Sequence, residues 1–163
     1  MTTEELDWVS AEARSRYESQ ASLFEAVRRE AITTLALSVG IASGALGFAV
    51  DAAASGPAWV AASAGVFAAY IGLIAVTLVV LGLRTSDYYP MSNDPKHLAA
   101  PLQSGEFTLE AVREVELENM QERIDFNRTR GDRLGATLNG AWIALAVAPM
   151  VWAVSAVVLR AVG

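Results

Sequence analysis

The sequence predicts an all-α fold built on three membrane-spanning helices. Three apolar runs, 31–50, 58–83 and 136–159, contain no Asp, Glu, Lys, Arg or His. Each is long enough to cross about 30 Å of hydrocarbon, which takes roughly 20 helical residues. Runs this few and this long do not suit a closed barrel, so helices are the structures that satisfy the backbone in lipid. We expect one membrane domain, 1–163.

The composition of the chain limits its partners. Of 163 residues, 53% are hydrophobic and 18% charged, and the net charge is −6. That negative charge lies almost wholly outside the apolar runs and leaves no basic stripe for phosphates, so we expect no nucleic-acid partner. The absence of cysteine excludes disulfides and thiolate sites. About 30 polar residues precede the first run, a pattern that does not fit a signal peptide.

Residues 1–30 are predicted to form an amphipathic helix on the cytoplasmic side. Apolar residues recur every three or four positions along it: Leu6, Val9, Ala13, Tyr17, Phe24 and Val27. This stripe could lie on the membrane surface or pack against another helix. Acids outnumber bases on the polar face, so we favour helix packing. No helix breaker follows, and the helix is expected to continue into the first span.

The first span, 31–50, carries small residues at helical spacing. Gly40, Gly44 and Gly47 would let helix backbones approach closely, as lipid-embedded helices do when they associate. Their partner is either this chain or another copy. The following Ser55-Gly56-Pro57 stretch is short enough to force an antiparallel hairpin.

The second span, 58–83, offers a second small face at Gly65 and Gly72. Tyr70 lies near its middle, where the hydroxyl needs a hydrogen-bond partner. A neighbouring helix is the favoured source of that partner, and a polar pore is the alternative.

The segment 84–135 is predicted to be a cytoplasmic loop followed by a helix. The loop holds the only histidine, His97, close to Asp94 and Lys96. An acid/base or metal site could be built on it, but one histidine supplies too few ligands, and we favour a solvated loop residue.

A second amphipathic helix is predicted over 109–130, with Thr108 as its cap. Glu114, Glu118 and Glu122 recur at helical spacing, and paired carboxylates can bind metal when a histidine completes the set. No such histidine follows, so a solvated acidic stripe is the stronger interpretation. We expect the two polar helices to meet through an interface made of Phe24, Val27, Leu117, Met120 and Ile124.

The third span, 136–159, carries another ladder of small residues at Gly140, Ala144 and Ala148. All three spans carry ladders of small residues, and both polar helices carry an apolar stripe. Together these surfaces are larger than one three-helix unit can bury. We therefore expect a homo-oligomer embedded in the lipid bilayer.

The distribution of Lys and Arg predicts the orientation. Four precede the first span, none lies between the first and second, and seven lie between the second and third. The positive-inside rule then gives a multi-pass protein of the cell membrane with its N-terminus in the cytoplasm and its C-terminus outside. No Asp, Glu, Lys, Arg or His lies well inside a span, which disfavours a transporter acting alone.

The order of elements resembles a known group. A leading helix and tight hairpin come first, followed by Tyr88-Tyr89-Pro90 and Asn93-Asp94-Pro95, then by a charged helix that runs through Asn127 and Arg133 into a last span. In this layout the chain is similar to the Pycsar membrane effectors of bacteria and, more loosely, to SLATT-type antiphage effectors. No motif matches residue by residue, so no functional residue is carried over.

The resemblance implies a small membrane effector that assembles and perturbs the bilayer, or forms a pore, when a partner signals infection. No nucleotide-binding or sensor domain is present, so the trigger would come from elsewhere. The alternative is a non-catalytic scaffold or accessory subunit that recruits a cytoplasmic protein partner. We expect no enzyme activity and no catalytic, cofactor or metal site, because no nucleophile, base and ligand set is found together.

Overall fold

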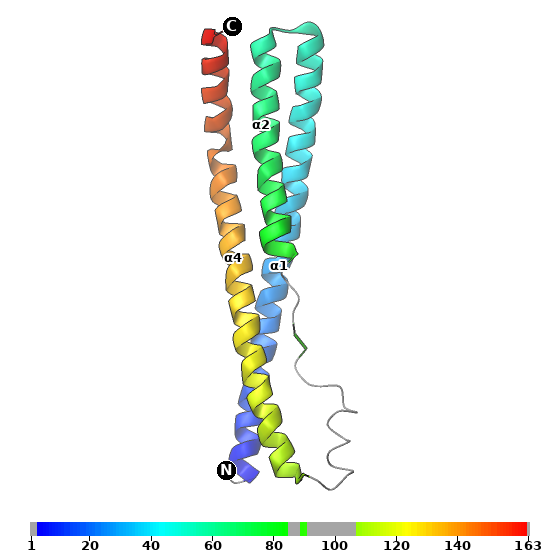
Figure 1. Cartoon of the computed structure of the whole chain (residues 1–163), viewed down its shortest axis with the longest axis vertical. Helices are drawn as coiled ribbons and strands as arrows, with labels where there is room; N and C mark the ends of the chain where they lie inside the picture. The colour runs from blue at the N-terminus through cyan, green and yellow to red at the C-terminus, as the bar shows by residue number, and fades with distance from the viewer. Residues whose placement is uncertain (1–2, 85–88, 91–106, 163) are drawn as a thin grey trace. The chain divides into compact units, whose positions relative to one another are not determined.

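The computed structural model describes residues 3–84, 89–90 and 107–162 and is helical over nearly all of them (Figure 1). The helices are α1 (Thr3–Ser55), α2 (Ala58–Thr77), the π-helix η1 (Leu78–Leu83) and α4 (Leu109–Val162). No strand occurs in these described ranges. The predicted all-helical fold is confirmed.

Three helical stretches are long and apolar enough to cross a membrane: Glu4–Ser55, Ala58–Leu83 and Leu109–Val162. Only 17%, 33% and 6% of the residues in their most apolar windows are buried. Most of the apolar side chains therefore point away from the rest of the chain. A water-soluble protein rarely exposes so much contiguous apolar surface.

Helix α1 passes from the polar N-terminal residues into the first apolar run without a break. Its 53 residues contain no proline, and its glycines are tolerated because the surrounding Ala and Leu residues are strong helix formers. The helix continues five residues beyond the predicted end of the first span, to Ser55. The expected continuity of polar helix and span is confirmed.

The turn after α1 lies at the predicted Gly56 and Pro57. The N–H of Gly56 still donates to the carbonyl of Ala52 at 2.8 Å, and Pro57 then adopts an extended conformation (φ −66°, ψ 138°) as the N-cap of α2. A Cβ on Gly56 would lie 3.0 Å from the oxygen of Ala52, so a larger residue would crowd this turn.

The last six residues of the second apolar run, Leu78–Leu83, form the π-helix η1 directly after α2. The N–H of Arg84 donates to the carbonyl of Val79, five residues earlier, at 2.8 Å. This five-residue hydrogen-bond spacing is that of a π-helix. The buried Gly82 permits close packing, since a Cβ there would lie 3.1 Å from Cδ1 of Leu134 on α4. The sequence predicted one continuous helix and no π segment.

Helix α4 joins the second polar helix and the third span in one helix of 54 residues. Thr108 precedes it as predicted, and its Oγ1 accepts a hydrogen bond of 3.2 Å from the N–H of Ala111. Gly131 and Gly135 do not interrupt the helix, and Pro149 lies inside it. Because proline has no N–H, the carbonyl of Leu145 loses its intrahelical donor.

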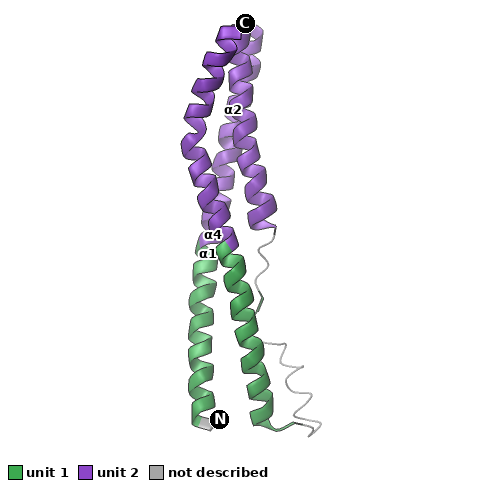
Figure 2. Ribbon diagram, turned by 60° about the vertical axis from the view of Figure 1, so that its left-hand side comes forward, with its two compact units in different colours: residues 1–26, 87–132 green, residues 27–86, 133–163 purple. Residues whose placement is uncertain are grey.

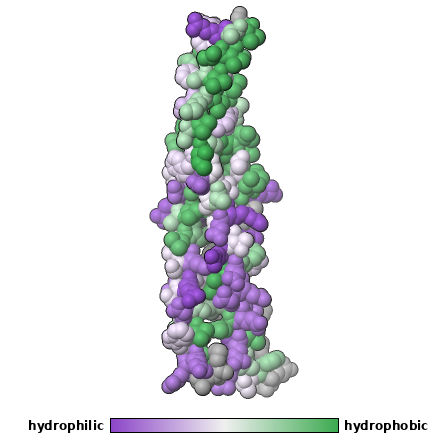
Figure 3. Space-filling view, turned by 90° about the vertical axis from the view of Figure 1, so that its left-hand side faces the viewer, coloured by the Kyte–Doolittle hydropathy of each residue, from purple (hydrophilic) through white to green (hydrophobic). Residues whose placement is uncertain are grey.

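The chain forms two compact units, each made of segments distant in sequence (Figure 2). Unit 1 contains residues 1–26 and 87–132, and unit 2 contains residues 27–86 and 133–163. In the space-filling view, apolar atoms gather over the segments of unit 2 and hydrophilic atoms over those of unit 1 (Figure 3). The single domain expected from the sequence stays a prediction.

Unit 2 packs through small and β-branched residues more than through glycine. Its buried residues on α1 are Ala31, Thr34, Ser38, Ala49 and Ala52, and those on α2 include Ser63, Ala64, Ala68, Ile71, Ile74 and Ala75. On α4 they are Leu134, Leu138, Ala141 and Ala148. In lipid, burying apolar surface against another helix gains little, because lipid tails are equally apolar. Small residues instead let helix backbones approach and pack closely.

The hydroxyls in this core are satisfied within their own helices. Ser38 donates to the carbonyl of Thr34 at 2.8 Å, Thr34 donates to Glu30 at 2.9 Å, and Ser63 donates to Val60 at 3.0 Å. With these bonds made, each side chain packs as a small apolar residue, at no cost of an unpaired polar group.

Candidate functional site

The candidate site lies in unit 1, where the first part of α1 and the first part of α4 run side by side (Figure 2). Arg113 Nη1 lies 3.1 Å from Asp7 Oδ1, and a Cβ on Gly131 would lie 3.8 Å from Cδ2 of Phe24. Residues closer to the start of α1 therefore lie beside residues closer to the start of α4, and later residues lie beside later ones. The two helices are parallel, as in a two-stranded coiled coil.

The predicted interface residues are largely buried in this pair. Phe24 is 5% exposed, Met120 8% and Ile124 5%, while Leu117 is partly buried. Tyr17 completes the core with Met120 and Ile124. Val27, the fifth predicted member, is partly buried and belongs to unit 2. The residues lie where helix packing would place them, and the partner function assigned to the interface stays a prediction.

A third segment is held against this pair by its backbone. The N–H of Tyr89 donates to Asn127 Oδ1 at 3.0 Å, and Asn127 Nδ2 donates to the carbonyl of Tyr89 at 3.2 Å. The hydroxyl of Tyr17 donates to the same carbonyl at 2.7 Å. Three hydrogen bonds thus converge on one residue. We call Asn127 and Tyr17 the backbone clamp.

The side chain of Tyr89 adds an aromatic contact to the clamp. Its ring meets that of Phe126 edge to face, with centroids 4.7 Å apart and planes at 85°. The guanidinium of Arg130 lies 4.4 Å from the centroid of Phe126. Contacts of these two kinds are each worth about 0.5–1.5 kcal/mol. They select for an aromatic residue at position 89, whereas the backbone bonds accept any residue but proline.

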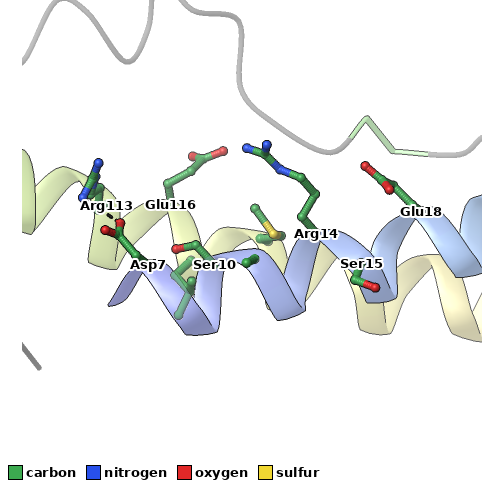
Figure 4. A pocket seen from close by; sticks show the side chains of 10 residues that line it. Asp7, Ser10, Arg14, Ser15, Glu18, Arg113 and Glu116 are labelled. Atoms are coloured by element: carbon green, nitrogen blue, oxygen red, sulfur yellow. Dashed lines mark hydrogen bonds and ion pairs between the residues drawn. The ribbon is translucent and has the colours of Figure 1, made fainter. Parts of the chain in front are cut away.

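An open cleft lies along the same pair, closer to its start (Figure 4). It has a volume of about 520 Å³ and is lined by Asp7, Ser10, Ala11, Arg14, Ser15, Glu18, Arg113, Glu116, Leu117 and Met120. Figure 4 shows carboxylates and guanidinium groups of both helices around it, with Arg113 turned to Asp7. Such a mixture of charges suits a polar protein segment with charges of both signs.

The ion pairs around the cleft differ in exposure. The side chains of Arg113 and Asp7 are 42% and 64% exposed, and such pairs contribute about 0–1 kcal/mol. Arg123 and Glu116, at 3.4 Å, are only 17% and 16% exposed. The second pair is better shielded from salt and constrains α4 locally more than the first.

The glycines predicted as packing positions have no close neighbours within the described chain. A Cβ placed on Gly40, Gly44, Gly47, Gly65, Gly72 or Gly140 would meet no atom within 4 Å outside its own helical turn. Ala144 is partly buried, and Ala148 is buried at 3% exposure. The glycine ladders therefore make no close packing contacts within the described part of the chain, and their assignment to contacts between copies stays a prediction.

Two buried features were missed in the sequence, one in this site and one in unit 2. Asn127 is only 2% exposed, and although it was placed on the charged helix from the sequence, nothing there indicated that its side chain is buried. The inward face of α1 at Thr34 and Ser38 was also missed, because the prediction rested on glycine at neighbouring positions. The three- and four-residue spacing of Ala31, Thr34 and Ser38 was the available clue.

Other predicted residues fall elsewhere. His97, Asp94 and Lys96 lie outside the described residues. Glu114, Glu118 and Glu122 are exposed, and within the described ranges no three His, Cys, Asp or Glu side chains group as metal ligands would. Comparisons of the chain with known protein families, with curated proteins and with solved structures found no match.

Proposed function

We propose that the chain is a multi-pass protein of the cell membrane with its N-terminus in the cytoplasm and its C-terminus outside. Support comes from the outward-facing apolar side chains of its three long helices and from the excess of Lys and Arg around the first polar helix and the middle segment. Trp59 and Arg160 lie together, with the guanidinium 5.9 Å from the ring, as suits an interface between lipid and water.

Within the membrane, the protein acts as a partner-regulated, oligomeric effector that perturbs the bilayer or forms a pore. The observation that carries this proposal is helix continuity. Both members of the polar pair, α1 and α4, continue without interruption into apolar stretches long enough to span a membrane. A displacement of one helix of the pair has a direct mechanical route to a span. No chemical step is assigned to the chain.

A scaffold that recruits a cytoplasmic protein is the second candidate. The charged cleft between α1 and α4 favours it, since Asp7, Arg14 and Glu116 offer charges of both signs to a protein segment. Electrostatic complementarity of this kind gives specificity and rapid association. The scaffold function would leave the membrane intact.

Membrane potential separates the two candidates. Under the effector proposal, overproduction of the chain in bacteria, alone or with its activating partner, depolarises the cells, and the purified chain under the same conditions releases a small dye from phospholipid vesicles. Met120→Glu places a charge in the core of the polar pair and should abolish both effects while membrane insertion persists. Val115→Glu is the matched control on the same helix, because Val115 is 57% exposed. Full potential and intact vesicles at every protein level, with the activating partner present, would favour the scaffold.

A further inference from the structure

An apolar groove follows the C-terminal half of the third span in unit 2. It lies between α2 and α4, near the end of the unit where α2 begins and α4 finishes (Figure 1), and has a volume of about 510 Å³. Among the described residues that line it, Val66 belongs to α2 and Val147, Val151 and Val158 to α4. Its one side-chain hydroxyl, that of Ser155, donates to the carbonyl of Trp152 at 2.8 Å. Such a lining favours an apolar occupant over water.

The groove has about the depth of one bilayer leaflet. Val147 and Leu159 are the first and last residues of α4 that line it, and 12 residues of helix span about 18 Å. One leaflet supplies half of a hydrocarbon core of about 30 Å. Leu159 is also the last residue of the predicted third span. An acyl chain of that leaflet would therefore run alongside the groove over most of its length.

The lining side chains suit an acyl chain better than a helix of a second copy. Helices approach closely in lipid where small residues line the contact, and no glycine or alanine is among the described residues that line this groove. Its lining also includes the exposed side chains of Met150, Val154 and Val158. These side chains would keep a helix of about 10 Å diameter away from the floor of the groove, whereas a flexible acyl chain fits between them.

A cation lies at the mouth of the groove. A second hollow adjoins the first at Leu159, and its lining includes Trp59. The guanidinium of Arg160 lies 5.9 Å from the centroid of the Trp59 ring, which places it beside this hollow. Asp51 on α1 is the other charged side chain at this end of unit 2 in the described part of the chain, and it forms no ion pair with Arg160. The positive charge is thus available to an anionic group of the occupant.

We propose that this groove binds an anionic phospholipid, with an acyl chain between α2 and α4 and the phosphate on the Arg160 guanidinium. Guanidinium groups donate paired hydrogen bonds to phosphate oxygens. A headgroup with no cation of its own leaves the phosphate charge to Arg160. This inference rests on the proposed membrane location, because an acyl chain reaches the groove from a bilayer. Under the proposed orientation the lipid belongs to the outer leaflet.

Native mass measurement of the full-length chain tests the site, because it reports bound lipid and oligomeric state together. The chain is reconstituted in vesicles of equal parts phosphatidylglycerol and phosphatidylcholine and then released in mild detergent. Phosphatidylglycerol should be retained over phosphatidylcholine by about fivefold, the effect of one Arg near a membrane surface. Arg160→Gln should remove this preference. Arg84→Gln is the matched control after the other end of the second span and should preserve it.

Filling the groove tests the place of the acyl chain. Val154→Trp puts a large ring into the groove and should abolish the retention of both lipids. Leu73→Trp is the matched control, because Leu73 is 64% exposed, close to the 62% of Val154, and does not line the groove. Equal retention of the two lipids by the unmodified chain would overturn the inference. Lipid retention unchanged by Val154→Trp, with loss of an oligomer, would assign the groove to a second copy instead.

Extraction of cell membranes with alkaline carbonate separates this inference from the proposed membrane location. A chain that stays with the membranes but retains no lipid in the mass measurement overturns the lipid site alone. A chain that the carbonate releases overturns the membrane location and the lipid site with it.

Discussion

The hydroxyl of Tyr70 donates a hydrogen bond of 3.0 Å to the backbone carbonyl of Ala144 and so joins α2 to α4 within unit 2. The sequence predicted that a neighbouring helix would satisfy this hydroxyl, and that prediction is confirmed. The acceptor lies one residue before Leu145, whose carbonyl loses its helical donor to Pro149. The bond from Tyr70 therefore holds α4 at a point where one of the helix's own backbone hydrogen bonds is missing.

Removing this hydroxyl should weaken unit 2 modestly. Tyr70→Phe is expected to lower the free energy of unfolding by about 0.6 kcal/mol and at most about 1.7, the range of hydrogen bonds between membrane helices. Thr77→Val is the control, because the Thr77 hydroxyl donates to the carbonyl of Leu73 in its own helix and joins no second helix among the described residues. Unfolding of the purified protein in mixed micelles measures both. A loss no larger for Tyr70→Phe than for Thr77→Val would contradict the assigned role.

A charge in the polar pair should separate its helices. Phe24 is 5% exposed, whereas the adjacent Leu23 is 64% exposed, so the same change to Glu tests burial alone. Phe24→Glu is expected to cost several kcal/mol and to raise hydrogen exchange along residues 3–26 and 109–132. Leu23→Glu should leave exchange close to that of the unmodified chain. Equal protection in both variants would mean that the pair does not depend on Phe24.

Two glycines distinguish contacts within the chain from contacts between copies. A Cβ on Gly44 meets nothing within 4 Å, while one on Gly82 would lie 3.1 Å from Leu134. Gly44→Leu should leave unfolding unchanged or slightly improved and weaken self-association by about 1–2 kcal/mol. Gly82→Leu should instead lower stability by about 1–3 kcal/mol through overpacking.

Cross-linking in membranes and native mass measurement report the association, with Gly140→Leu as a second outward-facing test. A purely monomeric unmodified protein would refute self-association. A loss of stability in Gly44→Leu would show that Gly44 packs within the chain after all.

The proposed orientation is open to direct labelling, because the chain has no cysteine. Single cysteines at Ser19 and Ser104 should react only after the membrane is permeabilised. Those at Ser55 and Gly163 should react with an impermeant reagent in intact cells. Outside labelling at position 19 or 104 would reverse the orientation.

Helix positions were accessible to sequence reasoning because the signals are local. Charge-free runs of sufficient length mark the spans, Pro57 cannot continue α1, and Thr108 offers a side-chain acceptor to the first turn of α4. The same reasoning gave Phe24, Met120 and Ile124, since the polar helices have one apolar face each.

The inward faces of the spans were less accessible. A helix surrounded by lipid is apolar on every side, so hydropathy does not distinguish Ser38, which is buried, from Gly40, which is exposed. The backbone clamp was not accessible either, because Asn127 recognises the main chain of a residue 38 positions away. Hydrogen bonds to a main chain do not depend on the side chain of the residue that they hold. Such contacts therefore leave no recognisable pattern in the sequence.

The parallel pairing of α1 and α4 has a consequence for biosynthesis. Asp7 and Arg113 are separated by 106 residues, so the first helix emerges from the ribosome long before its partner exists. At 5–20 residues per second, the delay is roughly 5–20 s. During that interval the stripe through Tyr17 and Phe24 has no α4 to pack against. The nascent chain therefore passes through a stage in which its N-terminal helix exists before the helix that buries its apolar stripe.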